Sequence, residues 1–320
     1  MMKTIHPASP PPLARRRALL LALATQAAAP LLISRGARAQ SSSMLLRPIP
    51  SGGPALPVIG LGSWITFNVG NDRAARDNCA EVMRTFFALG GRVIDSSPMY
   101  GSAQEVIGYG LGKLGQAGQP APLFAADKVW VSPGARGPAQ IETSRQHWNV
   151  PRFDLLQVHN LLAWQDHLPM LLAMKAAGQL RYVGITTSEG RRHRELEQIM
   201  ASQPLDFVQV TYNVLDREVE QRIFPLARER RIGVIVNRPF RQGELIRSVA
   251  RHPLPAWAAE IDCANWAQIL LKFIVSHPAV TCVIPATSSV AHVLENMGAG
   301  VGRLPDESMR RRIVAHVEKL

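Results

Sequence analysis

Short apolar segments alternate with longer amphipathic segments along most of the chain. The apolar segments have the length of strands, and the longer ones repeat their apolar positions every three to four residues, as helices do. The predicted strands lie at 58–61, 92–95, 123–128, 153–158, 181–185, 206–210, 232–236 and 280–284. The predicted helices lie at 73–89, 103–114, 138–148, 166–177, 190–201, 217–230, 258–276 and 289–297. Eight strands that alternate with eight helices predict an α/β protein whose parallel sheet closes into a (β/α)8 TIM barrel.

Three further segments flank or interrupt this alternation. The segment 44–57, with Ser51–Gly53 at its centre, predicts an N-terminal β-hairpin that would close the floor of the barrel. The connection 237–257 follows the seventh strand and is long, and long loops in compact domains often have a function. The stretch 306–318 predicts a polar helix outside the barrel. A chain of 320 residues accommodates one such barrel, which we place at 40–320.

Residues 1–39 are typical of an export signal. A basic segment, Arg15–Arg17, precedes an apolar run from Ala18 to Ile33, and Ala37–Ala39 supplies the small-x-small pattern of a cleavage site before Gln40. The apolar run is shorter than the ~20 residues of a membrane span, so we expect no stable membrane insertion. The twin arginines favour the twin-arginine export machinery, with an ordinary secretory signal as the alternative. This route exports folded proteins, so the chain could bind a cofactor before export to the periplasm.

Charge and cysteine content narrow the possible functions only slightly. Residues 1–39 contain six Lys or Arg residues and no acidic residue. Residues 40–320 therefore carry +6 of the formal net charge of +12. The remaining arginines are scattered, and such a distribution does not predict nucleic-acid binding. The three cysteines have no metal or redox spacing, so no metal site is predicted. Cys79 and Cys282 lie in apolar stretches, as expected of buried thiols. The sequence does not decide whether Cys263 forms a disulfide.

Reactive side chains end three consecutive predicted strands. Asp95 ends the second strand, Lys128 the third, and His159 follows the fourth, while Tyr100 lies five residues beyond Asp95. Enzymes of this fold keep their active sites at the carboxyl ends of the strands. We therefore expect these four side chains to meet at one rim of the barrel. Asp95 and Lys128 could instead be a structural ion pair, and a lone histidine is often structural, so the joint placement is what favours a catalytic site.

These residue types suit the reduction of a carbonyl group. A carbonyl that receives a hydride becomes an alkoxide and needs a proton, which Tyr100 can donate. Because a free tyrosine has a pKa near 10, a nearby Lys128 would favour its phenolate and make the transfer reversible. Asp95 would hold the lysine charged, and His159 would orient the carbonyl oxygen and stabilise its developing charge.

Several sequence blocks, in the right order, resemble the aldo/keto reductase family from about residue 55 to about residue 300. The resembling blocks are 92–104 (RVIDSSPMYGSAQ), 106–108 (VIG), 126–129 (ADKV), 153–159 (FDLLQVH), 178–185 (GQLRYVGI), 209–213 (QVTYN), 284–285 (IP) and 295–296 (EN). The resemblance implies a barrel oxidoreductase in which Asp95, Tyr100, Lys128 and His159 form the catalytic tetrad, with Tyr100 as the proton donor.

The same resemblance implies a nicotinamide cofactor, NADP(H), with NAD(H) left open. The implied cofactor-binding residues are Thr186, Thr187, Gln209, Asn237, Arg238, Ala286, Thr287, Ser288, His292, Glu295 and Asn296. Thr186 and Thr187 stand where relatives carry Ser-Asn, and Asn237 stands where an aromatic ring often stacks on the nicotinamide. Arg238 could contact a pyrophosphate or form a rim salt bridge. Ala286 and His292 stand where many relatives carry residues that bind the 2′-phosphate, so the sequence does not itself show NADP(H) preference.

The sequence thus predicts a periplasmic carbonyl/alcohol oxidoreductase that transfers a hydride to an aldehyde or ketone. The alternative is an exported barrel that binds a carbonyl or sugar ligand, or the cofactor, without turnover. The departures in the cofactor residues favour this alternative, and the intact tetrad argues against it. Trp164, Phe240 and Trp257 lie in loops that could wall the pocket, but they do not identify the substrate.

Overall fold

The structure is a computed structural model that describes residues 43–118 and 122–320. The predicted export signal at 1–39 lies outside the described residues. Eight parallel strands form one sheet in chain order: β3 (Leu61–Gly62), β4 (Val93–Asp95), β5 (Phe124–Val129), β6 (Leu155–Val158), β7 (Tyr182–Thr186), β8 (Phe207–Thr211), β9 (Gly233–Asn237) and β10 (Val280–Val283). Bridges from Ile59 to Val283 and from Gly62 to Ala286 join the two edges. The predicted (β/α)8 barrel is confirmed.

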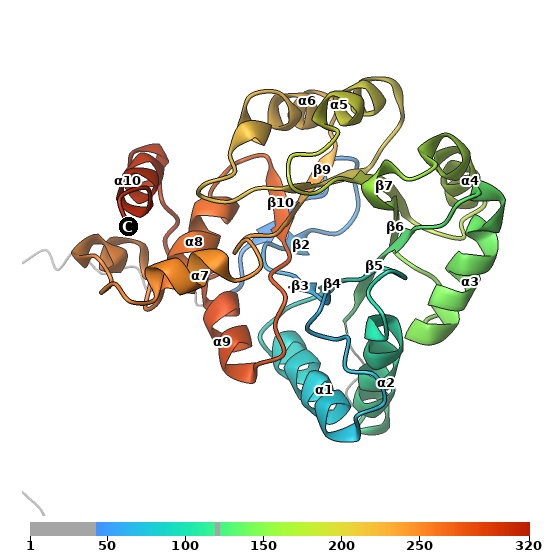
Figure 1. Cartoon of the computed structure of the whole chain (residues 1–320), viewed down its shortest axis with the longest axis horizontal. Helices are drawn as coiled ribbons and strands as arrows, with labels where there is room; N and C mark the ends of the chain where they lie inside the picture. Colours follow the sequence, from blue (N-terminus) through green and yellow to red (C-terminus); the bar gives the residue numbers. More distant parts are fainter. Residues whose placement is uncertain (1–42, 119–121) are drawn as a thin grey trace, which may run out of the picture. The chain divides into compact units, whose positions relative to one another are not determined.

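Helices surround this barrel; α1 to α8 connect its strands, and α9 and α10 follow the last strand (Figure 1). They are α1 (Arg73–Ala88), α2 (Ala103–Gln116), α3 (Gly137–Trp148), α4 (Trp164–Ala176), α5 (His193–Ser202), α6 (Ile223–Glu229), α7 (Glu244–Val249), α8 (Trp266–Val275), α9 (Val290–Gly298) and α10 (Glu307–Val317). Short 3-10 helices lie at η1 (Gly134–Arg136), η2 (His159–Leu161), η3 (Glu218–Glu220) and η4 (Ala256–Ile261).

Two predicted helices are shorter than the pattern suggested, and one helix was not predicted. The segment 258–276 is split between η4 and α8, because Asp262 adopts a left-handed φ of 51° and Asn265 caps α8 by accepting from the Gln268 amide. The segment 217–230 is likewise divided between η3 and α6. Helix α7 lies inside the predicted loop 237–257 and has only six residues, too few for a periodic signal.

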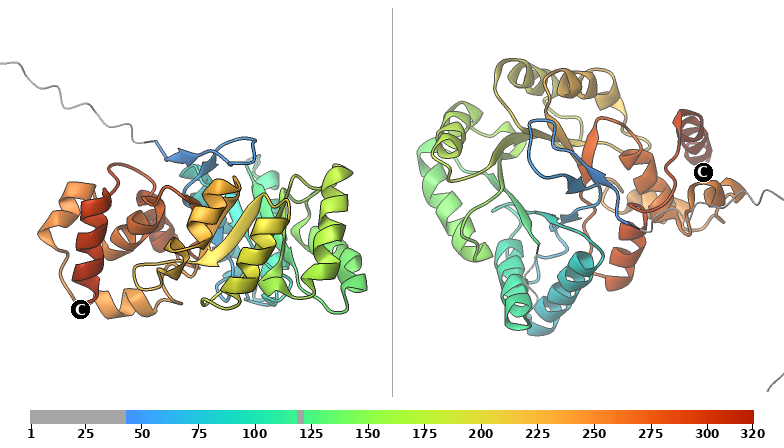
Figure 2. Two further views of the ribbon diagram at one scale, coloured as in Figure 1. Left: turned by 90° about the horizontal axis from the view of Figure 1, so that it is seen from above. Right: turned by 180° about the vertical axis from the view of Figure 1, so that it is seen from behind.

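The N-terminal hairpin closes the floor of the barrel, as predicted. Strands β1 (Leu46–Arg47) and β2 (Leu56–Pro57) pair antiparallel and lie across one end of the barrel (Figure 2). Ile49 and Leu56 belong to the same buried cluster as the first residues of β4 to β8. The Tyr182 hydroxyl donates to the Gly52 carbonyl at 3.0 Å. At Gly53, with φ of +107°, a Cβ would lie 1.9 Å from the Tyr182 oxygen, so this close approach requires glycine.

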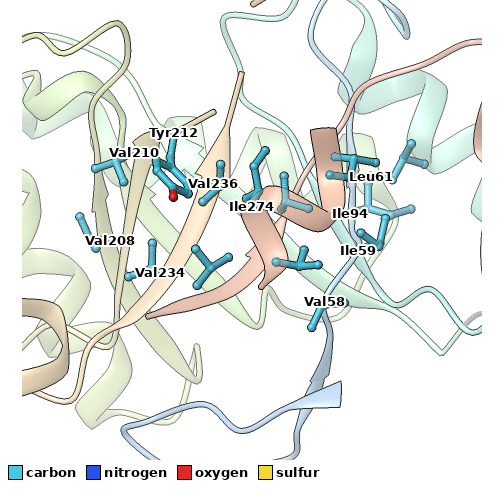
Figure 3. Close-up of a cluster of buried hydrophobic side chains, with 14 of the residues drawn as sticks. Val58, Ile59, Leu61, Ile94, Val208, Val210, Tyr212, Val234, Val236 and Ile274 are labelled. Atoms are coloured by element: carbon cyan, nitrogen blue, oxygen red, sulfur yellow. The ribbon is translucent and has the colours of Figure 1, made fainter. Parts of the chain in front are cut away.

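Alternation along the strands decides which side chains face the barrel interior and which face the helices. In β5, Phe124 and Ala126 belong to the interior cluster and Lys128 bonds to Asp95, whereas Ala125 and Val129 pack in the outer core. Asp127 therefore points outward, away from the site. Figure 3 shows part of the outer core, whose members include Val208, Val210, Val234, Val236 and Ile274.

The last helix lies on the outside of the barrel, as the sequence predicts. Arg310 of α10 donates to the Phe273 carbonyl of α8 and pairs with Glu220 at 2.9 Å. All three cysteines are free and buried. No helix among residues 43–118 and 122–320 is both long enough and apolar enough to cross a membrane.

Candidate active site

A cavity of about 680 Å³ opens at the carboxyl ends of the barrel strands. Asp95, Tyr100 and His159 line it, together with residues of α9 and of the segment before α9. β4 carries Asp95, the loop after β4 carries Tyr100, and His159 directly follows β6. The cavity thus lies where enzymes of this fold keep their sites.

Asp95 and Lys128 form a buried ion pair at the base of this cavity. The Lys128 ammonium donates to Asp95 Oδ2, and it donates to the Ser96 carbonyl at 2.7 Å. The Lys128 side chain is 0% exposed and the Asp95 side chain is 2% exposed. A lysine removed from water to this extent is stable as a cation only when its donors are satisfied. Burial would lower the pKa of Lys128, but Asp95 and Tyr100 outweigh this effect and raise it above its usual value.

Tyr100 lies over this lysine. The Lys128 ammonium is 5.2 Å from the centroid of the Tyr100 ring. Burial raises the pKa of Tyr100 above its usual value, and the Lys128 charge opposes that increase. The phenol is therefore protonated at neutral pH, while the lysine stabilises the phenolate that proton donation would produce.

His159 completes the set of predicted catalytic residues. Its ring lies edge-on to Tyr100, with centroids 5.7 Å apart and planes at 86°. Its Nδ1 is 2.8 Å from the Ser97 hydroxyl. Burial, with the Lys128 charge as a second cause, lowers the pKa of His159 to about 2, so the imidazole is neutral at physiological pH. The structure brings together all four residues that the sequence singled out.

Two glutamines support Asp95, and sequence reasoning missed the role of both. Gln157 and Gln209 donate to Asp95 Oδ1 at 3.1 and 2.9 Å. Gln157 was not singled out, although a polar residue two positions before His159 must face the same side of β6. Gln209 was predicted as a cofactor contact, and it also lines the cavity. Together with Lys128, these amides satisfy both oxygens of the carboxylate.

The predicted nicotinamide contacts after β7 and β9 are hydrogen-bonded to neighbouring strand ends. Thr186 accepts from the Asn160 amide at 3.0 Å and lines the cavity. Asn237 donates to the Thr187 carbonyl at 3.0 Å and accepts from the Thr211 hydroxyl at 2.7 Å. The Thr187 hydroxyl is buried without a partner among the described residues and does not line the cavity. A cofactor role for Thr187 stays a prediction.

Arg238 forms the rim salt bridge that was one of its two predicted roles. Its Nη1 lies 2.8 Å from the Glu189 carboxylate, and both residues line the cavity. Arg247 of α7 also lines the cavity and was not predicted, because its helix was taken for a loop. No carboxylate pairs with the Arg247 guanidinium within the described part of the chain. It is therefore a cation available to an anionic ligand.

The segment before α9, with the helix itself, contributes a further part of the cavity wall. Ala286, Thr287, His292, Glu295 and Asn296 line it, whereas Ser288 is exposed outside it. Thr287 accepts from the Ser289 amide at 3.0 Å, and Ser289 caps α9 by accepting from the His292 amide. These groups place hydrogen-bonding side chains at the wall of the cavity, close to the N-terminus of α9.

Apolar residues also line the cavity. Trp64 and Ile65, exposed to 37% and 61%, line the cavity. Ile65 has a φ of +63°, which is rare for a β-branched residue. Of the aromatic residues predicted to wall the pocket, Phe240 lines it, whereas Trp164 and Trp257 do not. Trp257 packs in the core because η4 turns it inward.

The cavity fits a nicotinamide dinucleotide in size and in chemistry. Its volume is in the range of cofactor sites. Arg238, Arg247 and His292 offer cationic or donor groups along its length, and Gln209 lies beside the tetrad. No group of three or more residues able to hold a metal ion occurs within 43–118 and 122–320.

Comparison with known proteins gives matches over most of the chain. The model of the aldo/keto reductase family matches residues 58–317. The aldo-keto reductase YhdN of Bacillus subtilis is 24% identical over 190 residues, 56% of this chain and 56% of that protein. The NADH-specific methylglyoxal reductase of Escherichia coli is 26% identical over 231 residues, 62% of this chain and 68% of that protein. A crystal structure of an aldo/keto reductase from Klebsiella pneumoniae, in complex with NADP and acetate, has a TM-score of 0.69 at 23% identity and covers 87% of this chain and 95% of that one.

Proposed function

Since this chain belongs to the aldo/keto reductase family, we propose that it transfers a hydride between a nicotinamide cofactor and an aldehyde or ketone, with Tyr100 as the proton donor. The observation that carries the proposal is the buried Lys128 cation, which Asp95 holds against the Tyr100 ring at the base of the cavity. A barrel that only bound a ligand would have no need to bury a charged pair beside a phenol.

The chain's own residues would handle the proton. When bound, the nicotinamide supplies the hydride. Tyr100 donates its phenolic proton to the carbonyl oxygen as negative charge develops there, and Lys128 stabilises the resulting phenolate. Asp95, with Gln157 and Gln209 behind it, keeps the lysine fixed and charged. His159 lies beside Tyr100 and can hydrogen-bond the same oxygen.

NADP(H) is the cofactor that we propose, with NAD(H) as the alternative. The Klebsiella pneumoniae structure contains NADP, and the Escherichia coli relative is named as NADH-specific. In this chain, Arg238, Arg247 and His292 would contact the cofactor phosphates, and Gln209 would contact the nicotinamide end. Glu189 and Glu295 also line the cavity, and their negative charges would oppose a further phosphate.

Turnover of reduced cofactor tests the proposal directly. We expect the purified protein to consume NADPH, and NADH more slowly, when aldehydes or ketones are added, as followed by the absorbance of the reduced nicotinamide. Consumption that does not depend on the carbonyl compound would contradict the proposal. Binding of cofactor and carbonyl without any consumption would instead support a barrel that binds without turnover.

We also infer that residues 1–39 direct the chain through the twin-arginine machinery to the periplasm, with cleavage before Gln40. Arg16 and Arg17, the following apolar run and the Ala37–Ala39 pattern support this. A barrel that closes around a cofactor benefits from folding before export.

Substitution of the twin arginines tests the export route. We expect the full chain, expressed in a bacterium with this pathway, to appear in the periplasm at its shortened length. The double change Arg16→Lys and Arg17→Lys should leave it unprocessed in the cytoplasm, whereas Arg15→Lys, a matched loss of one arginine outside the pair, should not. Export of the double variant at the wild-type level would point to an ordinary secretory signal.

A further inference from the structure

Ser97 is a fully buried residue in the loop after β4, between Asp95 and Tyr100. Its hydroxyl has two contacts. It lies 2.8 Å from Nδ1 of His159, and it accepts a hydrogen bond from the Met99 amide at 3.3 Å. The loop that carries Tyr100 is therefore hydrogen-bonded through this side chain to the histidine that directly follows β6.

The direction of the Ser97–His159 hydrogen bond follows from counting donors and acceptors. A serine hydroxyl has one hydrogen to donate. The Met99 amide approaches Ser97 as a donor, so it cannot receive that hydrogen. No other acceptor contacts the hydroxyl among the described residues, and burial excludes solvent. If Nδ1 carried the ring proton, the serine hydrogen would be buried without an acceptor, which is energetically unfavourable.

Building on the proposed function, we propose that Ser97 is a positioning residue, which donates to Nδ1 of His159 and thereby holds the ring proton on Nε2. A neutral imidazole carries one proton, and the partner of one nitrogen decides which nitrogen carries it. Because Nδ1 is turned toward Ser97, the Nε2 side of the ring is left to face the cavity that His159 lines.

This tautomer gives the carbonyl oxygen a second hydrogen-bond donor beside Tyr100. The opposite tautomer would present the Nε2 lone pair to that oxygen, and two acceptors would face each other as negative charge develops. Burial and the neighbouring Lys128 cation both disfavour a second proton on the ring, so a doubly protonated imidazole does not supply the missing donor. The hydroxyl of Ser97 thus acts on the reaction through His159 without contacting the substrate.

Nitrogen NMR of the histidine rings reports the tautomer without any need for turnover. In the full-length protein at neutral pH, we expect the His159 signals of a proton on Nε2 and a hydrogen-bonded acceptor at Nδ1. His159→Gln identifies these signals by their disappearance. In Ser97→Ala, the Nδ1 signal should lose the signature of a hydrogen-bonded acceptor. A wild-type spectrum with the proton on Nδ1 overturns the proposal, whether or not any Ser97 variant folds.

Kinetics test the consequence for the reaction. We expect Ser97→Ala to lower kcat/KM by roughly 10- to 100-fold, less than the loss of a donor that contacts the reacting oxygen directly. Ser97→Thr keeps a hydroxyl and should recover most of the activity.

Ser144→Ala is the matched control, because Ser144 is also buried but bonds to Gln104 in the outer layer. Equal effects of Ser97→Ala and Ser144→Ala on kcat/KM would contradict the positioning role. If the wild-type protein turns over no carbonyl, the proposed function fails, but the NMR result still decides the tautomer.

Discussion

Replacing Tyr100 with phenylalanine is expected to lower the rate of carbonyl reduction by about 10²- to 10⁴-fold, the usual contribution of a positioned proton donor. The change removes one oxygen atom and keeps the ring that lies beside Lys128 and His159. Cofactor affinity, measured by the fluorescence of bound NADPH, should therefore stay near that of the wild-type protein. A variant that reduces carbonyls at the wild-type rate would exclude Tyr100 as the donor.

The pH dependence of the wild-type protein provides an independent check. If Tyr100 is the proton donor, as proposed, reduction requires its protonated form, and burial raises the pKa of this phenol despite the opposing charge of Lys128. The ionisation of Tyr100 should therefore not limit reduction at neutral pH, and its effect should appear only at alkaline pH. Oxidation of the corresponding alcohol requires the phenolate and should become faster as the pH rises. Tyr100→Phe should remove this response.

The fold was predictable because the strands of a closed barrel are short, apolar and separated by amphipathic helices. The family model confirms the resemblance, and with it the predicted oxidoreductase class. The joint placement of Asp95, Lys128 and His159 was predictable for the same reason, since consecutive parallel strands end at one rim. The predicted export signal lies outside the described residues and stays a prediction.

The hydrogen bonds behind the site were not predictable from the pattern. Gln209 reaches Asp95 across 114 positions of sequence, and Gln157 reaches it across 62. Such contacts depend on the register of strands that only the closed barrel fixes. The Arg238–Glu189 pair likewise joins two loops whose conformations have no periodic signal.

Successive side chains of β5 point to opposite faces of the sheet, so Asp127 and its catalytic-site neighbour have different roles. Its neighbour Lys128 faces the site, so Asp127 faces the helix layer, where it is fully buried. It accepts from Gln104 Nε2 at 2.7 Å and from the Lys128 amide at 2.7 Å. Burial raises the pKa of Asp127 to about 7, and these two hydrogen bonds only partly offset the effect. The buried surroundings of Asp127 therefore favour the protonated, uncharged form of its carboxyl group.

Asp127→Asn is accordingly expected to stabilise the protein at pH 8 and to have a smaller effect at pH 5. Between the unfolded pKa of about 4 and the folded pKa of about 7, the folded chain keeps a proton that the unfolded chain has lost, so stability falls as the pH rises through this window. Three pKa units set an upper limit of about 4 kcal/mol at pH 8. For a chain of this size we expect a rise in Tm of several degrees.

The asparagine can keep both hydrogen bonds at this position. Its side-chain oxygen can accept from the Lys128 backbone amide. If the side-chain amide of Gln104 rotates, the Gln104 oxygen can accept from the new asparagine amide group and from the hydroxyl of Ser144, which already contacts Gln104 at 2.9 Å. Glu142→Gln on α3 is the control, because an exposed carboxylate paired with Arg145 contributes little to stability. Thermal unfolding of all three proteins from pH 5 to pH 8 measures the difference. If the plots of Tm against pH for the wild-type protein and Asp127→Asn are parallel, Asp127 has the same pKa in the folded and the unfolded chain. Its ionisation between β5 and α2 would then not destabilise the folded protein.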